Sequence, residues 1–159
     1  MTDVFDPSKR SLVMAGIRGR GNLSTELAMV KLLRDAHIIG WRRHICLRPK
    51  LSVEDIELAT KKGAGRILTR PDFVFRPGKL ALFVDGCFWH GCPVHATAPM
   101  QNADFWSAKL ARNVRRDGAQ TRALEAAGWR VLRIWEHELL RDRVALTKRL
   151  LRLFADACG

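Results

Sequence analysis

The stretch from residue 70 to residue 95 constrains the fold of this chain most. It reads RPDFVFRPGKLALFVDGCFWHGCPVH. Two short apolar runs, 72–75 and 80–84, flank an Arg-Pro-Gly-Lys turn, and this pattern predicts an antiparallel β-hairpin. One aspartate opens the first run, another follows the second, and two cysteines and two histidines then surround a Phe-Trp pair. The sequence therefore predicts that acidic, thiol, imidazole and aromatic side chains gather at one end of a hairpin.

Helices and a strand are expected on the N-terminal side of this hairpin. Asp6 and Pro7 are typical of a helix start, and a short helix should run to about residue 17. Ser24 can cap a second helix over 25–37, and residues 41–47 read as a strand. The apolar stripe expected on the second helix consists of Leu27, Val30, Leu33 and His37.

On the C-terminal side, Asn102 is expected to cap a long helix that Gly128 ends, and residues 129–135 read as a buried strand. A last helix, over about 139–157, should place Leu140, Val144, Thr147, Leu151 and Phe154 on one face. The order is helix, helix, three strands, helix, strand, helix. It predicts an α/β fold in which helices cover a mixed central sheet.

The segment 48–69 is the least expected part of this order. Residues 52–55 read as a capping box before a short helix, which Gly63 and Gly65 should stop. We interpret it as a basic surface insert in a single domain that spans residues 1–159, because a chain of this length holds one core of ordinary size.

The charge balance favours a polyanionic partner. Lys and Arg number 28 against 16 Asp and Glu, which gives a formal net charge of +12. A basic surface of this kind binds nucleic acid through counterion release; a basic but merely solvated surface is the alternative. The sequence has no expected signal peptide or membrane span, so we predict a cytoplasmic protein that does not bind membranes. In a reducing compartment, four cysteines suggest metal binding or inert thiols.

Asp72 and Asp85 are candidate metal ligands. The two residues lie at the start of one hairpin strand and the end of its partner, which are neighbours in an antiparallel pair. Carboxylates at a sheet edge suit Mg²⁺, which takes one or two of them and accepts phosphate oxygens. The alternative is that Asp72 only begins a strand.

A second set of candidate ligands has the spacing Cys87-x4-Cys92-x2-His95, joined by His137 after a distant strand. Two thiolates and two imidazoles suit tetrahedral Zn²⁺, and such an ion would pin an irregular loop. By spacing alone, His90 can replace His95 as a ligand. If it does not, it can relay a proton beside the carboxylates. Cys46 and Cys158 lie elsewhere and are expected to be inert.

Other candidates are open to two interpretations. Phe88-Trp89 and Phe105-Trp106 are adjacent aromatic pairs, which suit wedges that open a base step, although Trp106 on a helix also suits a core. Glu26 in a first helical turn favours the helix dipole, which is a structural role.

Taken together, these motifs resemble the very short patch repair (Vsr) mismatch endonucleases of the PD-(D/E)XK nuclease superfamily. The resemblance begins with SKRSLVMAGIRGR and TELAMVKLL and passes through RPDFVF and FVDGCFWHGCPVH. It continues through FWSAKLARNV to GWRVLRIWEHEL, in the same order and with similar spacing. The superfamily core of a helix, three strands, a helix and a strand agrees with the expected order.

The resemblance implies a role for each candidate residue. Asp72 resembles the metal-binding aspartate, with the Val84 carbonyl as a second Mg²⁺ ligand. Glu26 resembles the glutamate of the first core helix, and His90 the histidine that handles the proton. The zinc ligands that it implies are Cys87, Cys92, His95 and His137. The DNA-contacting residues that it implies are Phe88, Trp89 and Trp106 as a wedge from the major groove, Met14 from the minor groove, and Lys109 and Asn113 near the mispair.

The chain departs from the family in three places. It lacks the acid-x-lysine of the wider superfamily after Val84. Asp85 stands where some members have histidine, so we count it among the catalytic candidates, as a metal ligand or as a group that orients water. The insert 48–69, longer than the usual connection, can affect which DNA is chosen.

The resemblance implies a Mg²⁺-dependent endonuclease that nicks one strand of duplex DNA at a T:G mismatch and leaves a 5′-phosphate and a 3′-hydroxyl. The expected partners are double-stranded DNA and mismatch-repair proteins, with the chain acting as a monomer whose residues 1–22 form a DNA-contacting helix. The alternatives are a nickase or restriction-type nuclease with another DNA target, and a zinc-stabilised DNA-binding module without catalysis.

Overall fold

The computed structural model describes residues 25–59, 65–95 and 102–158. The expected first helix, with Met14, and the capping residue Ser24 lie outside the described residues. No helix in the described part is long and apolar enough to span a membrane.

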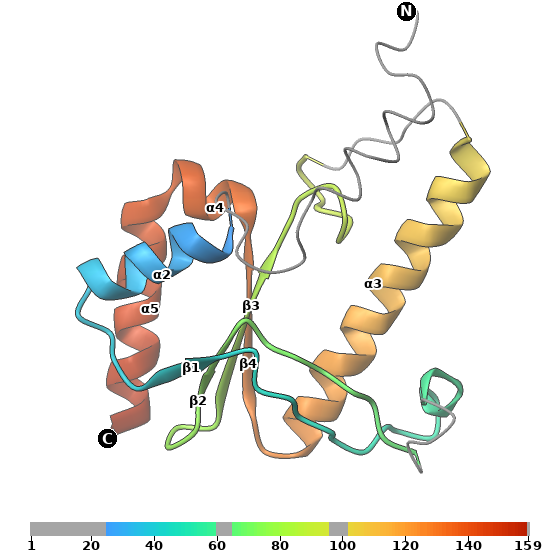
Figure 1. The fold of residues 1–159 in the computed structure, drawn as a ribbon, viewed down its shortest axis with the longest axis horizontal. Coiled ribbons are helices and arrows are strands. Elements are labelled where there is room, and N and C mark those ends of the chain that lie inside the picture. Colours follow the sequence, from blue (N-terminus) through green and yellow to red (C-terminus); the bar gives the residue numbers. More distant parts are fainter. Residues whose placement is uncertain (1–24, 60–64, 96–101, 159) are drawn as a thin grey trace, which may run out of the picture.

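The centre of the fold is a four-stranded sheet in the order β1-β2-β3-β4 (Figure 1). The strands are β1 (Trp41–Arg43), β2 (Phe73–Phe75), β3 (Leu80–Asp85) and β4 (Arg130–Trp135). The first three pair antiparallel, and β3 and β4 pair parallel. The predicted mixed sheet and hairpin are thereby confirmed. The expected strand 41–47 is shorter than predicted, because His44 has a positive φ of 53° and turns the chain out of the sheet.

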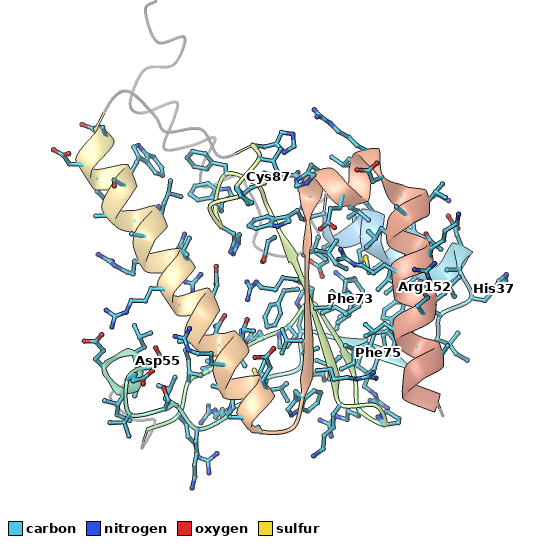
Figure 2. The ribbon with its side chains drawn as sticks, turned by 180° about the vertical axis from the view of Figure 1, so that it is seen from behind. His37, Asp55, Phe73, Phe75, Cys87 and Arg152 are labelled. Carbon is cyan, nitrogen blue, oxygen red and sulfur yellow. The ribbon has the colours of Figure 1, made fainter. Side chains whose placement is uncertain are left out.

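Helices cover both faces of the sheet. On one side lie α2 (Glu26–Asp35), α4 (Glu136–Arg141) and α5 (Arg143–Cys158), and on the other lies α3 (Ala103–Ala126) (Figure 1). Phe73 and Phe75 point into the layer between the sheet and α5 (Figure 2). Residues of β3 alternate between the layers: Leu80 and Leu82 join the core under α2 and α5, whereas Ala81 and Phe83 face α3.

The expected inner faces of two helices are only partly correct: Val30, Leu33 and Phe154 pack in the core as predicted, but other members of each face do not. Leu27 is 36% exposed, and Leu140, Val144 and Leu151 are also exposed. The residues that are buried in addition are Met29 and Leu32 on α2, and Leu139, Leu146 and Leu150 on α4 and α5. Both alternatives satisfy a 3.6-residue period, and the rotation between them is set by packing on the sheet. The single last helix that was expected is broken at Asp142.

The insert 48–69 contains one 3₁₀ turn, η1 (Ile56–Leu58), among its described residues. The expected capping box is wrong, because the Ser52 hydroxyl donates to the Asp55 carboxylate (3.3 Å) instead of capping the backbone. Asp55 is buried and accepts hydrogen bonds from Arg122 on α3. The insert is thus fastened beside the C-terminal part of α3, where Figure 2 labels Asp55. Asn102 stands at the N-cap of α3 as expected, but its side chain makes no capping bond.

Candidate active site and metal centres

A cavity of about 860 Å³ opens at the C-terminal end of β3. All four catalytic candidates line it, together with the proposed carbonyl ligand: Glu26, Asp72, Val84, Asp85 and His90. Asp117 and Arg133, which sequence reasoning missed, line it as well. The fold therefore gathers residues from α2, β3, α3 and β4 around one space.

Asp72 precedes β2 and is the carboxylate with the most unusual environment. Its Oδ2 accepts a hydrogen bond from the Val84 N–H at 2.8 Å. Within the described part of the chain, it forms no salt bridge. Burial raises the pKa of Asp72 to about 6, and the nearby negative charges of Glu26 and Asp85 act in the same direction. A cation at this carboxylate would relieve that cost.

Glu26 lies in the first turn of α2 and is 4% exposed. Arg43, the last residue of β1, donates through Nε to its Oε1 at 2.8 Å, and through Nη2 to the same oxygen. The His44 Nε2 lies 2.5 Å from that oxygen. One ligand atom from each of Glu26, His44 and Asp72 falls within 4.8 Å of the others. Arg43 and His44 were not singled out from the sequence, because their approach depends on the pairing of β1 with β2.

Asp85 is held by an arginine. It is 3% exposed, and Arg133 on β4 donates to Oδ2 through Nε (2.6 Å) and to Oδ1 through Nη2 (2.9 Å). The parallel register places Asp85 opposite Trp135, two residues beyond Arg133, so both side chains face α3. The sequence signal for this pair is that a charged residue, Arg133, stands at an inward-facing position of a strand.

His90 is paired with Asp117 on α3. Its Nδ1 lies 2.6 Å from Asp117 Oδ2 and 3.6 Å from Asp85 Oδ1. Although burial acts to raise it, the pKa of Asp117 is lowered overall by the hydrogen bond with His90 and by the charges of Arg133 and His90. Asp117 is therefore ionised at neutral pH and accepts the Nδ1 proton, which leaves Nε2 as the ring nitrogen that Asp117 does not engage.

The four predicted zinc ligands converge. One ligand atom from each of Cys87, Cys92, His95 and His137 lies within 4.8 Å of the others. His137 Nδ1 is 3.3 Å from Cys87 Sγ and 3.6 Å from Cys92 Sγ, and His95 Nδ1 is 3.9 Å from Cys92 Sγ. His90 lies outside this group and faces Asp117, which decides between the two histidines that spacing left open. Figure 2 labels Cys87 in the loop after β3, near the start of α4.

The aromatic candidates form one cluster beside this loop. The ring centroid of Phe88 lies 5.0 Å from that of Trp89 and 5.7 Å from that of Trp106. Lys109 Nζ lies 5.0 Å from the centroid of the Trp106 ring, and Asn113 Nδ2 donates to the Trp89 carbonyl at 3.1 Å. Trp106 is 9% exposed, so within the described residues it packs as the base of the cluster.

Comparisons with known proteins agree with this geometry. The sequence model of a family described as DNA mismatch endonuclease Vsr matches residues 45–95. The chain is 38% identical over 152 residues to the type II nicking enzyme V.XorIIP of Xanthomonas oryzae. This alignment covers 94% of the chain and 95% of that enzyme. It is 54% identical over 79 residues to V.NaeI of Lentzea aerocolonigenes, covering 50% of the chain and only 48% of that enzyme. It is 40% identical over 87 residues to the DNA mismatch endonuclease Vsr of Escherichia coli, covering 51% of the chain and 55% of that protein.

Proposed function

The chain belongs to the Vsr family of DNA endonucleases, and from this membership we propose that it nicks one strand of duplex DNA at a T:G mismatch. The observation that carries the proposal is the cavity in which Asp72, Glu26 and the His90–Asp117 pair meet. A divalent-ion site and a basic imidazole in one cavity are what phosphodiester hydrolysis requires. A DNA-binding module without catalysis would need neither.

The donors around Asp72 fit Mg²⁺. The Asp72 carboxylate and the adjacent Val84 carbonyl offer hard oxygen ligands, which Mg²⁺ prefers, and the buried Glu26 carboxylate lies beside them. Asp72 is the member of this group without an ion pair among the described residues, so it is the one that a cation would neutralise. When bound, Mg²⁺ supplies Lewis-acid stabilisation of charge on the phosphate. Glu26, held by Arg43 and His44, would keep the site acidic and in position.

His90 would act as the proton acceptor. Asp117 fixes the ring through Nδ1, so Nε2 is the nitrogen that can take a proton from an attacking water. Attack in line with the 3′ oxygen would release a 3′-hydroxyl and leave a 5′-phosphate. In a chain without the superfamily lysine, this histidine would supply the basic group.

We assign Zn²⁺ to the Cys87, Cys92, His95 and His137 cluster. Two thiolates and two imidazoles are the usual tetrahedral set of a closed structural site. Such an ion would join the loop after β3 to the start of α4. It would thereby fix His90 together with Phe88 and Trp89, which are parts of the same loop.

The DNA would lie against the aromatic cluster. Phe88 and Trp89 are half-buried and packed on Trp106, so they are supported as a wedge beside the mismatch. Lys109 and Asn113 lie next to these rings and would contact the mispaired bases or the backbone. Met14, as the partner from the minor groove, belongs to the proposal as an expectation from the sequence. We propose that the enzyme acts as a monomer in the cytoplasm, in a pathway with mismatch-repair proteins.

The test is strand-resolved cleavage of end-labelled duplexes that differ only in a T:G or a T:A pair. We expect one nick, in the strand that carries the mismatched thymine, in Mg²⁺ and none in EDTA. The product should carry a 5′-phosphate that a ligase can rejoin. Equal cleavage of the matched duplex would contradict the mismatch specificity, and unchanged cleavage in EDTA would contradict the metal requirement.

A second candidate is a nicking enzyme with another DNA target. It is favoured by the relatives named type II nicking enzymes, one of which aligns over 94% of this chain. It is also favoured by the insert, which borders the cavity through Leu68. A panel of duplexes with all mispairs in varied flanking sequences separates the two. A nick set by flanking sequence alone would favour the second candidate.

A further inference from the structure

The pair of Asp85 and Arg133 is the strongest polar contact of the cavity that the proposed mechanism does not use. Both carboxylate oxygens of Asp85 accept from the guanidinium, at 2.6 and 2.9 Å. Asp85 is almost fully buried, and the Arg133 side chain is 22% exposed. A planar fork that meets both oxygens of a carboxylate is the strongest form of such a pair.

Arg133 also reaches α3. Its Nη2 lies 3.5 Å from Asp117 Oδ1, and its Nη1 is within 3.4 Å of the Asp117 carbonyl and of Thr121 Oγ1. Its guanidinium lies 4.5 Å from the centroid of the Phe83 ring. One side chain thus connects β3, β4 and the residue of α3 that holds His90.

We propose that Arg133 is a positioning residue for the nicking reaction. It keeps Asp85 out of the coordination of the catalytic cation, and it holds Asp117 in place against His90. This inference rests on the proposed function. It assigns the cation to Asp72 and not to Asp85. The carboxylates of Asp85 and Asp117 then orient the imidazole of His90.

The reason that Asp85 does not bind the cation is electrostatic. A cation at Asp85 would have to displace a donor from one of its oxygens, and it would then face a guanidinium that has lost its partner in a buried place. Asp72 presents the opposite case, because it forms no salt bridge within the described residues and its Oδ2 accepts a hydrogen bond from the uncharged Val84 N–H at 2.8 Å. The cation therefore gains more at Asp72.

The test combines Arg133→Met, Asp85→Asn and the double variant, each assayed for melting temperature and for single-turnover nicking. Arg133→Met should lower the melting temperature by roughly 5–10 °C, because it leaves a buried carboxylate without its partner. It should reduce the single-turnover rate roughly 10–100-fold, the usual effect of losing a group that orients another, with DNA affinity unchanged. Arg133→Lys keeps the positive charge but cannot donate to both carboxylate oxygens in a planar fork. Its melting temperature and nicking rate should lie between those of the wild type and of Arg133→Met.

The double variant separates positioning from folding. Removal of both charges should restore most of the melting temperature, whereas the nicking rate should stay low, because Arg133 no longer holds Asp117 in place. Recovery of both would overturn the positioning role. Arg116→Met is the matched control, since Arg116 lies 3.4 Å from Asp117 but is half exposed and does not contact Asp85 within the described residues. It should change the rate less than threefold.

Cation binding gives an arm that needs no activity. Mn²⁺ titrations followed by electron paramagnetic resonance should show equal affinity in wild type and Asp85→Asn, and loss of binding in Asp72→Asn. An equal loss in both variants would make Asp85 a ligand and overturn the inference. A wild type that nicks none of the duplexes would overturn the proposed function itself, whereas a fully active Arg133→Met protein would overturn only the role of Arg133.

Discussion

The Cys/His cluster and the acidic cavity begin at the same end of β3, but they are built differently. Three of the four cluster residues come from one loop, and the cluster needs only His137 from elsewhere. The cavity draws its charged residues from α2, β3, α3, β4 and α4, and Glu26, Asp85 and Asp117 each have a cationic or imidazole partner. The comparison shows that a local sequence motif specifies the Cys/His cluster, whereas the strand register and the packing of α3 bring the residues of the cavity together.

The largest expected effect concerns the Cys/His cluster. Cys92→Ala should remove one ligand and with it the bound zinc, which would lower the free energy of unfolding by roughly 4 kcal/mol or more. Nicking should be lost as well, because His90 belongs to the same loop. Zinc content and thermal denaturation measure the effect. Cys46→Ala, at an exposed cysteine outside the cluster, is the control and should retain the zinc; equal stability of both variants would contradict a structural metal.

The next effect concerns Asp72 in the absence of divalent ions. Because burial raises the pKa of Asp72 from 3.8 to about 6, its charge destabilises the fold at neutral pH. Asp72→Asn should therefore stabilise the protein by up to about 3 kcal/mol above pH 6 in EDTA.

This gain should shrink as the pH falls from 6 to 4, where the folded wild type takes up the proton, and vanish below pH 4. Denaturant titrations at several pH values test it. A gain that does not depend on pH would show that Asp72 is not the destabilised carboxylate. Saturating Mg²⁺ should remove the difference at neutral pH, because it stabilises only the wild type.

A smaller effect is expected for the partner of His90. Asp117→Asn keeps the shape of the side chain but not its charge, so the single-turnover nicking rate should fall roughly 10–100-fold with zinc content unchanged. Because the pKa of Asp117 is lowered, the carboxylate adds stability above its ordinary pKa that is lost as the pH falls below it. A wild-type nicking rate in Asp117→Asn would show that Asp117 plays no part in the reaction.

The smallest effect should come from the insert. The partner of Asp55, Arg122, is half exposed, so Asp55→Asn should lower the stability only slightly and leave zinc and cation binding unchanged. Cleavage of duplexes with varied flanks should show whether loosening the insert changes the choice of target more than the rate. A lost cation site would contradict the separation of the insert from the cavity.

The sequence predicts a structural feature well when the residues that form it are close together in the chain. The hairpin and the Cys87–His95 loop were predicted because their signals are short-range turns and ligand spacings. Arg133 and Asp117 were missed, because a charged residue in a strand or helix usually faces water. The β3–β4 register shows that Arg133 faces inward, and the packing of α3 shows that Asp117 is buried. The inner faces of α2 and α5 were predicted only in part for a related reason: periodicity gives a stripe of residues, but packing on the sheet determines which stripe is buried.

The most direct test of the central claim is a single-turnover assay of Asp72→Asn on an end-labelled T:G duplex in Mg²⁺, with DNA binding measured in parallel. The account predicts that binding and zinc content are unchanged and that nicking falls by at least roughly a thousandfold. Nicking at the wild-type rate would show that the cation is not held at Asp72, and would contradict the account.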